Sequence, residues 1–385
     1  MACSACRPYR GDLAPAQLAA RSVRLSILLP SNRRSLLACS RIAQACSWAG
    51  PHVEVVVRDN SGDARKRELL AYFQRENCKV VAVDPCEPRE NFSETLRLAS
   101  GDFVFCLGDD DFCFDHAIAG LPDVIERIGK DPSIIGITGT YAIETVKGTS
   151  LAHYANIDSD DARTRVAGFL GYGGPNVLFY SVMRRELVSR IFDFMSNMPF
   201  SFSFHDQIMC MLYLLNGKFV PLQRLMYLYD VGVWQSRETA ERRDLDFYKD
   251  AGLDPAVNML QWIICGFEGA SLIMNSELLA MLPKAQRQPI ADLWFTTMFA
   301  RFKGDRRTAF NSQLANDAER WCEKLLDATG QLTFQRILAE ISGFIALSSN
   351  DTAQNYFDFW DAVINKRQPV SRHSKASRPV AVNQS

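Results

Sequence analysis

Three consecutive aspartates, Asp109, Asp110 and Asp111, directly follow an apolar run in this 385-residue sequence and have the residue type and spacing that most suggest chemistry. Carboxylates this close repel one another, so we expect a compensating cation beside them. Mg²⁺ and Mn²⁺ bind one or two carboxylates together with the phosphate oxygens of a substrate, which makes these aspartates candidate metal ligands. Aspartates are also common turn and cap residues, so a solvated loop is the alternative interpretation.

The acidic group is expected at the edge of an open α/β sheet, because short β-branched runs alternate with helix-length segments from residue 23 to residue 138. The predicted strands are 23–29, 53–57, 79–83, 102–107 and 134–138. The predicted helices are 35–48, 64–76, 92–99 and 115–129. This alternation implies parallel strands with right-handed crossovers. Such sheets bind ligands at the carboxyl ends of their strands, where this chain has polar residues at 30–33, 59–62 and 108–111.

The rest of the chain predicts a less regular segment and then a mostly helical one. A hairpin is expected around Lys147 and Gly148, followed by a helix near Arg163. The next predicted elements are a strand at 177–182, helices at 184–194 and 206–215, and strands at 218–221 and 226–229. We therefore predict four parts, which are an N-terminal segment (1–22), an α/β domain (23–237), an all-α region (238–365) and a disordered basic tail (366–385).

Composition excludes several classes of protein. Lys plus Arg number 43 against 44 for Asp plus Glu, so the total charge gives no indication of a nucleic-acid partner. The 11 cysteines are odd in number and scattered, which favours a reducing cytoplasm. Cys3 and Cys6 have ligand-like spacing, but no second such pair follows nearby, so a frayed segment is favoured over a zinc site. Neither a signal peptide nor a membrane-spanning helix is expected.

Three segments of the predicted sheet resemble family-2 glycosyltransferases of the GT-A fold. They are LSILLPSNRR (25–34), VEVVVRDNSG (53–62) and, after Asn91, ASGDFVFCLGDDD (99–111). The resemblance covers about residues 23–234 and includes the order and spacing of the segments. It implies a Rossmann-like open mixed sheet and an inverting transfer of a sugar from a nucleotide-sugar donor, a UDP-sugar by default. The implied acceptor is a hydroxyl of a glycan or lipid-linked saccharide, and the implied cofactor is Mg²⁺ or Mn²⁺.

The resemblance also implies roles for residues on the donor side. Pro30, Asn32 and Arg33 would lie along the nucleotide, and Asp59 would hydrogen-bond the base. Arg237, in a loop that closes over the diphosphate in related enzymes, could pair with a phosphate, although a surface role is the alternative.

The aspartates after the fourth strand would form the metal site of the family. Asp110 is the expected metal ligand, Asp109 would contact the ribose or a metal-bound water, and Asp111 completes the acidic group. Gly108 stands where the family often has its first aspartate. Which carboxylate touches the metal is therefore left open.

An inverting transfer needs a base for the acceptor hydroxyl, and Asp206 matches the family's catalytic aspartate. His205 replaces the glutamate that usually precedes it and is expected on the acceptor side. An aspartate in a first helical turn also interacts favourably with the helix dipole, so a structural cap is the alternative. Gly174 and Asn176, in a glycine-rich loop, and Trp234, after the last predicted strand, are further acceptor-side candidates.

A local charge pattern suggests peripheral attachment to the inner face of a membrane. Between residues 291 and 310, a large apolar face is expected from Trp294, Phe295, Met298, Phe299 and Phe302, beside the basic residues Arg301, Lys303, Arg306 and Arg307. No acidic residue follows Asp361 in the tail. Packing of the aromatic face inside the helical region is the alternative. We therefore expect a cytoplasmic enzyme that can contact a membrane.

Two rival functions remain open at this point. One is a catalytically degenerate GT-A protein that acts as a scaffold or carbohydrate-binding partner. The other is a sugar-phosphate nucleotidyltransferase, which the absence of glycine from the loop after the first strand disfavours.

Overall fold

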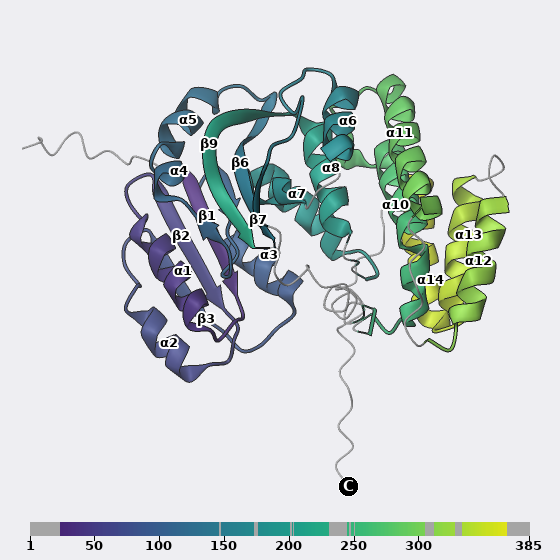
Figure 1. Ribbon diagram of the computed structural model, residues 1–385, viewed down its shortest axis with the longest axis horizontal. Coiled ribbons are helices and arrows are strands. Elements are labelled where there is room, and N and C mark those ends of the chain that lie inside the picture. Colours follow the sequence, from purple (N-terminus) through teal and green to yellow (C-terminus); the bar gives the residue numbers. More distant parts are fainter. Residues whose placement is uncertain are drawn as a thin grey trace, which may run out of the picture.

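The computed structural model describes residues 24–145, 148–172, 176–200, 202, 204–230, 245, 248–249, 251–304, 312–327 and 333–367. Its strands form one sheet in the order β3-β2-β1-β4-β8-β6-β9-β5, with β7 paired to β6 (Figure 1). The strands are β1 (Leu25–Ser31), β2 (Val53–Asp59), β3 (Cys78–Ala82), β4 (Phe103–Cys106), β5 (Phe112–Cys113), β6 (Ile134–Thr145), β7 (Gly148–Ala152), β8 (Val182–Arg184) and β9 (Lys218–Asp230).

The helices belong to two groups along the chain. Those interleaved with the strands are α1 (Leu36–Ser47), α2 (Ala64–Ala71), α3 (Pro88–Leu98), α4 (Asp115–Ala119), α5 (Leu121–Ile128), α6 (Ala162–Tyr172), α7 (Arg185–Ser196), α8 (His205–Asn216) and the 3₁₀ helix η2 (Val177–Tyr180). Those after the sheet are η4 (Pro255–Leu260), α10 (Gln261–Asn275), η5 (Glu277–Leu279), α11 (Lys284–Gly304), α12 (Ala315–Asp327), α13 (Phe334–Ala346) and α14 (Asn350–Ile364). The predicted fold class, an open mixed α/β sheet followed by an all-α region, is confirmed.

The first half of the sheet is parallel and brings three strand ends to one edge. β1 pairs with β2 so that Ser31 lies opposite Asp59, and with β4 so that Leu28 lies opposite Cys106. The strands are almost completely buried, as expected for a parallel sheet covered on both faces. The polar residues after β1, β2 and β4 therefore meet at the same carboxyl edge.

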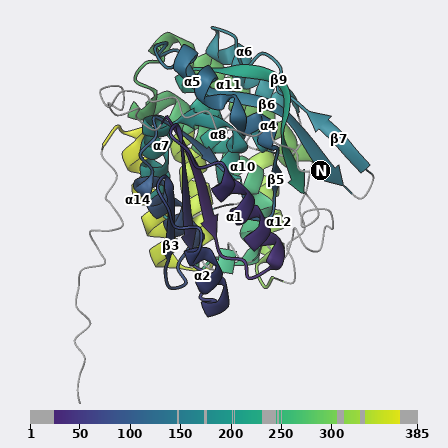
Figure 2. The same cartoon turned by 90° about the vertical axis from the view of Figure 1, so that its left-hand side faces the viewer.

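The second half of the sheet is mixed and departs from the predicted strands. A single strand of 13 residues, β9, replaces the two short strands expected at 218–221 and 226–229. Its pairing with β6 shifts register between Thr138 and Thr140, next to the position of Pro221, which has no N–H to donate. β9 continues past this irregularity and pairs with β5, which brings Tyr227 and Tyr229 to the acidic edge. The predicted hairpin is confirmed by the antiparallel pairing of β6 and β7, and Figure 2 shows β7 at the margin of the molecule.

The strand expected at 177–182 is wrong for its first four residues, which form η2. The backbone N–H groups of Val177 and Leu178 both donate to the hydroxyl of Tyr154, at 3.0 and 3.1 Å. A side chain from a distant part of the chain thus satisfies donors that a strand neighbour would otherwise satisfy. The helix expected at 115–129 is divided at Gly120, because Pro122 lies in the first turn of α5.

The helical region packs against the sheet domain and is not a separate body. In Figure 1 α6, α7 and α8 lie between the sheet and the helices α10 to α14, and α10 contacts α8 while α11 contacts α6. The predicted domain boundary at 237, the segment 1–22 and the tail after Arg367 lie outside the described residues.

The aromatic side chains of α11 belong to the core of this helical region. Trp294 and Met298 are fully buried, and Phe299 and Phe302 are nearly so. Trp294 donates its indole N–H to the carbonyl of Cys265 in α10, at 3.0 Å. The expected aromatic membrane face is therefore corrected to a packing face, as the alternative interpretation held. One helical stretch, Pro255–Asn275, is long and apolar enough to span a membrane, but 83% of its most apolar window is buried inside the protein.

Candidate functional site

A buried lysine connects the ends of β1 and β2. The Lys66 ammonium lies 2.7 Å from each of three oxygens, namely Asp59 Oδ1, Ser31 Oγ and the carbonyl oxygen of Arg33. The side chains of Lys66 and Asp59 are each only 2% exposed. Asp63 caps α2 by accepting from the Lys66 N–H, and this fixes the turn that directs the lysine to the strand ends. Sequence analysis missed Lys66, because nothing in its neighbourhood distinguishes it from the exposed Arg65 and Arg67 of the same helix.

Asp59, which the sequence predicts to bind the base of the nucleotide, accepts hydrogen bonds from protein groups. Besides Lys66, it accepts from the hydroxyl of Ser61 at 3.0 Å. The neighbouring Asn60 donates to the carbonyl of Cys86 at 2.8 Å and accepts from Asn91 at 3.0 Å. These contacts hold the β2 loop in place at the edge of the sheet, so its role toward a nucleotide base stays a prediction.

Arg33 lies over the acidic strand end. Its Nε is 3.0 Å from Asp109 Oδ1, and its terminal nitrogen pairs with Asp110. Asp109 also accepts from the hydroxyl of Ser31, so it is joined to Lys66 through a shared hydroxyl. The predicted donor-side residues Arg33 and Asp59 and the predicted metal-site residues Asp109 and Asp110 are thus brought together in one polar network.

The other predicted residues of this edge lie beside the network. Pro30 is half-buried at the end of β1, opposite Arg58, and Asn32 is exposed in the loop that follows. Both remain candidates for contact with a nucleotide.

Asp111, the third aspartate, is hydrogen-bonded to a strand of the sheet. It is 3% exposed and accepts from the hydroxyl of Tyr227 in β9 at 2.7 Å. Gly108 explains the departure from the family motif, because a Cβ at this position would lie 2.7 Å from Asp111 Oδ2 and 3.0 Å from Asp110 Oδ1. The space that a first aspartate would need is taken by the carboxylates of the two later ones.

The contacts of Asp109, Asp110 and Asp111 limit the kind of metal site that the acidic edge could form. Among the described residues, no group of three or more His, Cys, Asp or Glu side chains is arranged to hold a metal ion. Asp109 and Asp111 are buried and accept from protein donors, whereas the side chain of Asp110 is paired with Arg33 but is 30% exposed. This donor set fits a Mg²⁺ or Mn²⁺ ion that takes one protein carboxylate and completes its ligands with phosphate oxygens. It does not fit a cage built from protein ligands alone.

Asp206 lies in the first turn of α8. Burial raises the pKa of its carboxyl group to about 6, while the neighbouring amide of Asn176 and the N–H of Gln207 partly oppose this rise. Gln207 N lies 2.7 Å from Asp206 Oδ1. A carboxyl with a pKa near 6 is ionised at neutral pH and can accept a proton more readily than an ordinary aspartate.

Tyrosines of β9 and η2 connect Asp206 with the acidic edge. Burial raises the pKa of Tyr229, and the charges of Asp111, Asp206 and Asp110 add to that rise. Tyr180 stacks on Tyr227 with ring centroids 5.0 Å apart and lies 5.4 Å from Tyr229. Tyr180, Tyr227 and Tyr229 thus form an aromatic cluster beside Asp111, which accepts from the Tyr227 hydroxyl.

The structure describes only some of the predicted acceptor-side residues. Asn176 is beside Asp206, and its amide atoms are buried. His205 is also buried, and its ring contacts protein groups on both sides, as described below. Gly174, Trp234 and Arg237 lie outside the described residues.

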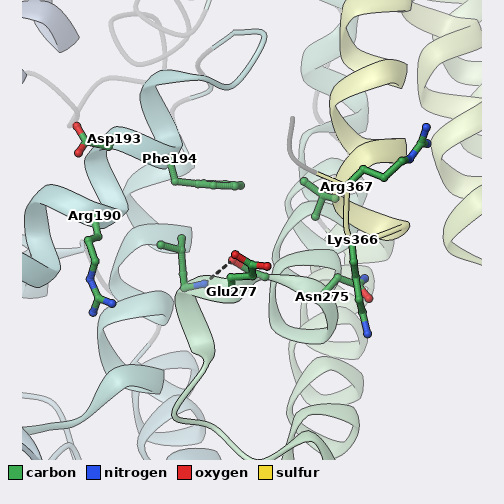
Figure 3. A pocket seen from close by; sticks show the side chains of 10 residues that line it. Arg190, Asp193, Phe194, Asn275, Glu277, Lys366 and Arg367 are labelled. Atoms are coloured by element: carbon green, nitrogen blue, oxygen red, sulfur yellow. Dashed lines mark hydrogen bonds between the residues drawn. The ribbon is translucent and has the colours of Figure 1, made fainter. Parts of the chain in front are cut away.

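A pocket of about 480 Å³ lies elsewhere, between α7 and the helical region (Figure 3). Arg190, Asp193 and Phe194 of α7 face residues around η5 and the end of α14. The remaining lining residues are Asn275, Ser276, Glu277, Leu278, Val363, Lys366 and Arg367. None of the predicted site residues lines this pocket, so it is distinct from the polar network.

No protein-family model matches the sequence, and no curated protein matches it. Solved structures are similar to it at low identity. S. aureus TarS 1–349 in complex with UDP-GlcNAc is 14% identical, with 90% of this chain and 93% of that chain covered and a TM-score of 0.49. Glucosyl-3-phosphoglycerate synthase from Mycobacterium tuberculosis is 15% identical, with 53% and 71% covered and a TM-score of 0.33.

Both similarities concern the course of the chain alone. At such TM-scores they carry no argument about donor, acceptor or mechanism. The class of fold rests on the strand order of this chain, and the site rests on the contacts of its own residues.

Proposed function

We propose that this chain is a metal-dependent, inverting glycosyltransferase. In this proposal it moves a sugar from a nucleotide-sugar donor, a UDP-sugar by default, to a hydroxyl of a glycan or lipid-linked saccharide. The observation that carries the proposal is the pairing of two kinds of carboxylate at one sheet edge. The side chain of Asp110 is 30% exposed next to Arg33, and Asp206 has a pKa near 6 and acts on Tyr229 together with Asp110 and Asp111.

The donor side is built to hold a charged diphosphate. Arg33 is a cation that can turn from the aspartates toward a phosphate, because its side chain is 36% exposed. Asp110 would hold Mg²⁺ or Mn²⁺, which when bound neutralises charge on the departing diphosphate. Lys66 and Ser31 hold two features in place, namely the loop that follows β1 and the carboxylate of Asp109. The donor therefore binds to a preformed surface.

On the acceptor side Asp206 would take the proton. The acceptor oxygen attacks the anomeric carbon from the face opposite the diphosphate, and the bond from that carbon to the phosphate oxygen breaks. The hydroxyl proton passes to the Asp206 carboxylate, and the bonding electrons leave with the nucleoside diphosphate. Attack from the opposite face inverts the configuration at the anomeric carbon.

A panel of nucleotide sugars, each with Mn²⁺, tests the proposal by thermal unfolding. A ligand that binds the native state alone raises stability in proportion to RT ln(1 + [L]/Kd). We expect one donor class to raise the midpoint and to release its nucleoside diphosphate when an acceptor is added. Donor binding without release under any acceptor would favour the scaffold alternative, and release of pyrophosphate from a nucleoside triphosphate would favour the nucleotidyltransferase.

The place of action is also a proposal. A cytoplasmic enzyme that reaches a lipid-linked acceptor needs contact with the membrane, and the basic residues after Asp361 could supply it. With the aromatic face of α11 buried, this attachment depends on charge alone.

A further inference from the structure

His205, directly before the candidate base, is bonded at both ring nitrogens. Nδ1 accepts from the backbone N–H of Phe202 at 3.2 Å, and Nε2 lies 3.1 Å from Glu268 Oε2 in α10. Because Nδ1 acts as an acceptor, the ring proton is on Nε2 and is donated to the Glu268 carboxylate. The orientation of this ring is therefore fixed from two sides.

Burial of the Glu268 carboxylate costs free energy, because the group is removed from water. Glu268 is 0% exposed, in the middle of a helix whose residues are nearly all buried. Its second oxygen accepts from the hydroxyl of Tyr356 in α14, at 3.0 Å. A buried carboxylate is tolerated only with such donors, and packing alone would be served equally well by an apolar residue.

The residue that follows the candidate base is also held by the helical region. Arg301 of α11 donates to Gln207 Oε1 at 3.4 Å, and its guanidinium lies over the ring of Trp262 at 5.2 Å. His205 and Gln207 thus both contact the helical region, whereas Asp206 between them interacts with Asn176 and lies near Tyr229. Since neighbouring residues of a helix point about 100° apart, fixing the two outer side chains fixes the direction of the middle one.

We propose that Glu268 is a positioning residue for the reaction, acting through His205 to hold the first turn of α8 so that the Asp206 carboxylate faces the donor edge. The inference rests on the proposed function, and it assigns to the helical region a part in that function. It also gives His205 a different task from the expected acceptor contact. Misplacement of a reacting group by about 1 Å can lower a rate by about 100-fold.

The test compares Glu268→Gln, His205→Phe and their double variant with the wild type. A matched control is Glu340→Gln, which loses a pair with Lys324 elsewhere in the helical region. Each protein is assayed for kcat at saturating donor, for Kd of the nucleoside diphosphate, and for hydrogen exchange in the first turn of α8. We expect kcat to fall by about 10- to 100-fold in each single variant with Kd unchanged, and exchange to rise in that turn.

The double variant separates positioning from general stability. If Glu268 acts through His205, the double variant loses no more activity than either single one. Losses that multiply, or an unchanged exchange rate in Glu268→Gln, would overturn the inference. Should Glu268→Gln fail to fold, Tyr356→Phe removes one donor to Glu268 while its ring stays stacked on Phe200, and it should cause a smaller loss of the same kind.

Failure of the proposed function gives a different result. If the wild type transfers no sugar from any donor, the glycosyltransferase proposal and the catalytic part of this inference fall together. Hydrogen exchange would then still show whether Glu268 holds the first turn of α8, because that measurement needs no substrate.

Discussion

The Arg33 guanidinium lies 3.0 Å from the carboxylate of Asp109, so the acidic strand end already has a cation from the chain itself. The same guanidinium also pairs with Asp110, the proposed metal ligand. A divalent cation that approaches without a nucleotide must therefore compete with Arg33. When a diphosphate is present, the arginine has a second anion to bind, and the carboxylate becomes available.

Replacing Arg33 by glutamine should tighten Mn²⁺ binding in the absence of nucleotide. A half-exposed ion pair contributes up to ~1 kcal/mol, so the Kd for Mn²⁺ should fall by up to about fivefold. Electron paramagnetic resonance of free Mn²⁺ measures this directly. Arg34→Gln is the control, because Arg34 donates to the carbonyl of Ser61 and touches no aspartate. Equal Mn²⁺ affinity in Arg33→Gln and wild type would contradict the competition.

Asp206→Asn should lower kcat by about 10²- to 10⁴-fold with donor affinity little changed, since the acceptor proton loses its base. In the wild type, kcat should fall as the pH drops through about 6, where Asp206 becomes protonated. The groups around this carboxylate are Asn176, Tyr229, Cys210 and Cys265. A collapse of donor binding in Asp206→Asn would instead make Asp206 a donor-side or structural residue.

Asp206→Asn should also change the free energy of unfolding, by an amount that depends on the pH. The folded-state pKa of Asp206 is raised from 3.8 to about 6, so the stability this group contributes is present below pH 3.8 and is lost as the pH rises through about 6. Asp206→Asn should therefore stabilise the protein at pH 7 by ~1–3 kcal/mol and have little effect at pH 4. Urea unfolding at the two pH values measures the difference. A destabilised variant at pH 7 would mean that burial does not dominate at this site.

Lys66→Met should strongly destabilise the fold, because it leaves Asp59 buried without its cation. Removing one partner of such a pair costs ~3–5 kcal/mol. Adding Asp59→Asn to Lys66→Met should recover part of that loss, since the buried charge is then removed. Arg67→Met, an exposed change in the same helix, is the matched control and should lie within ~0.5 kcal/mol of the wild type. Chemical denaturation of the wild type, the two single variants and the double variant measures these differences. Equal effects of Lys66→Met and Arg67→Met would contradict the prediction.

Site residues could be predicted from the sequence where the strand pattern alone determines their position. Asp59, Asp109 and Asp110 each follow a buried parallel strand, and the parallel pairing alone brings them to one edge. Lys66 could not be foreseen, because its burial depends on how α2 returns over the ends of β1 and β2. The 3₁₀ conformation at Val177 and Leu178 likewise depends on Tyr154, a residue more than 20 positions away. Glu268 interrupts an apolar stretch of the sequence, but its role could not be predicted, since its partners come from α8 and α14.

The proposed membrane contact now depends mainly on the basic tail, because Trp294, Met298, Phe299 and Phe302 of α11 are buried. Truncation after Arg367 removes Arg372, Lys375 and Arg378, each of which contributes about 1 kcal/mol near an anionic surface. The truncated chain should therefore bind anionic vesicles about 100-fold more weakly at low salt, as measured by co-sedimentation. Replacing these three residues by glutamine in the full chain should have the same effect, and neutral vesicles serve as the control. If the full chain binds no vesicle at low salt, or if truncation leaves its binding unchanged, attachment through the tail is excluded.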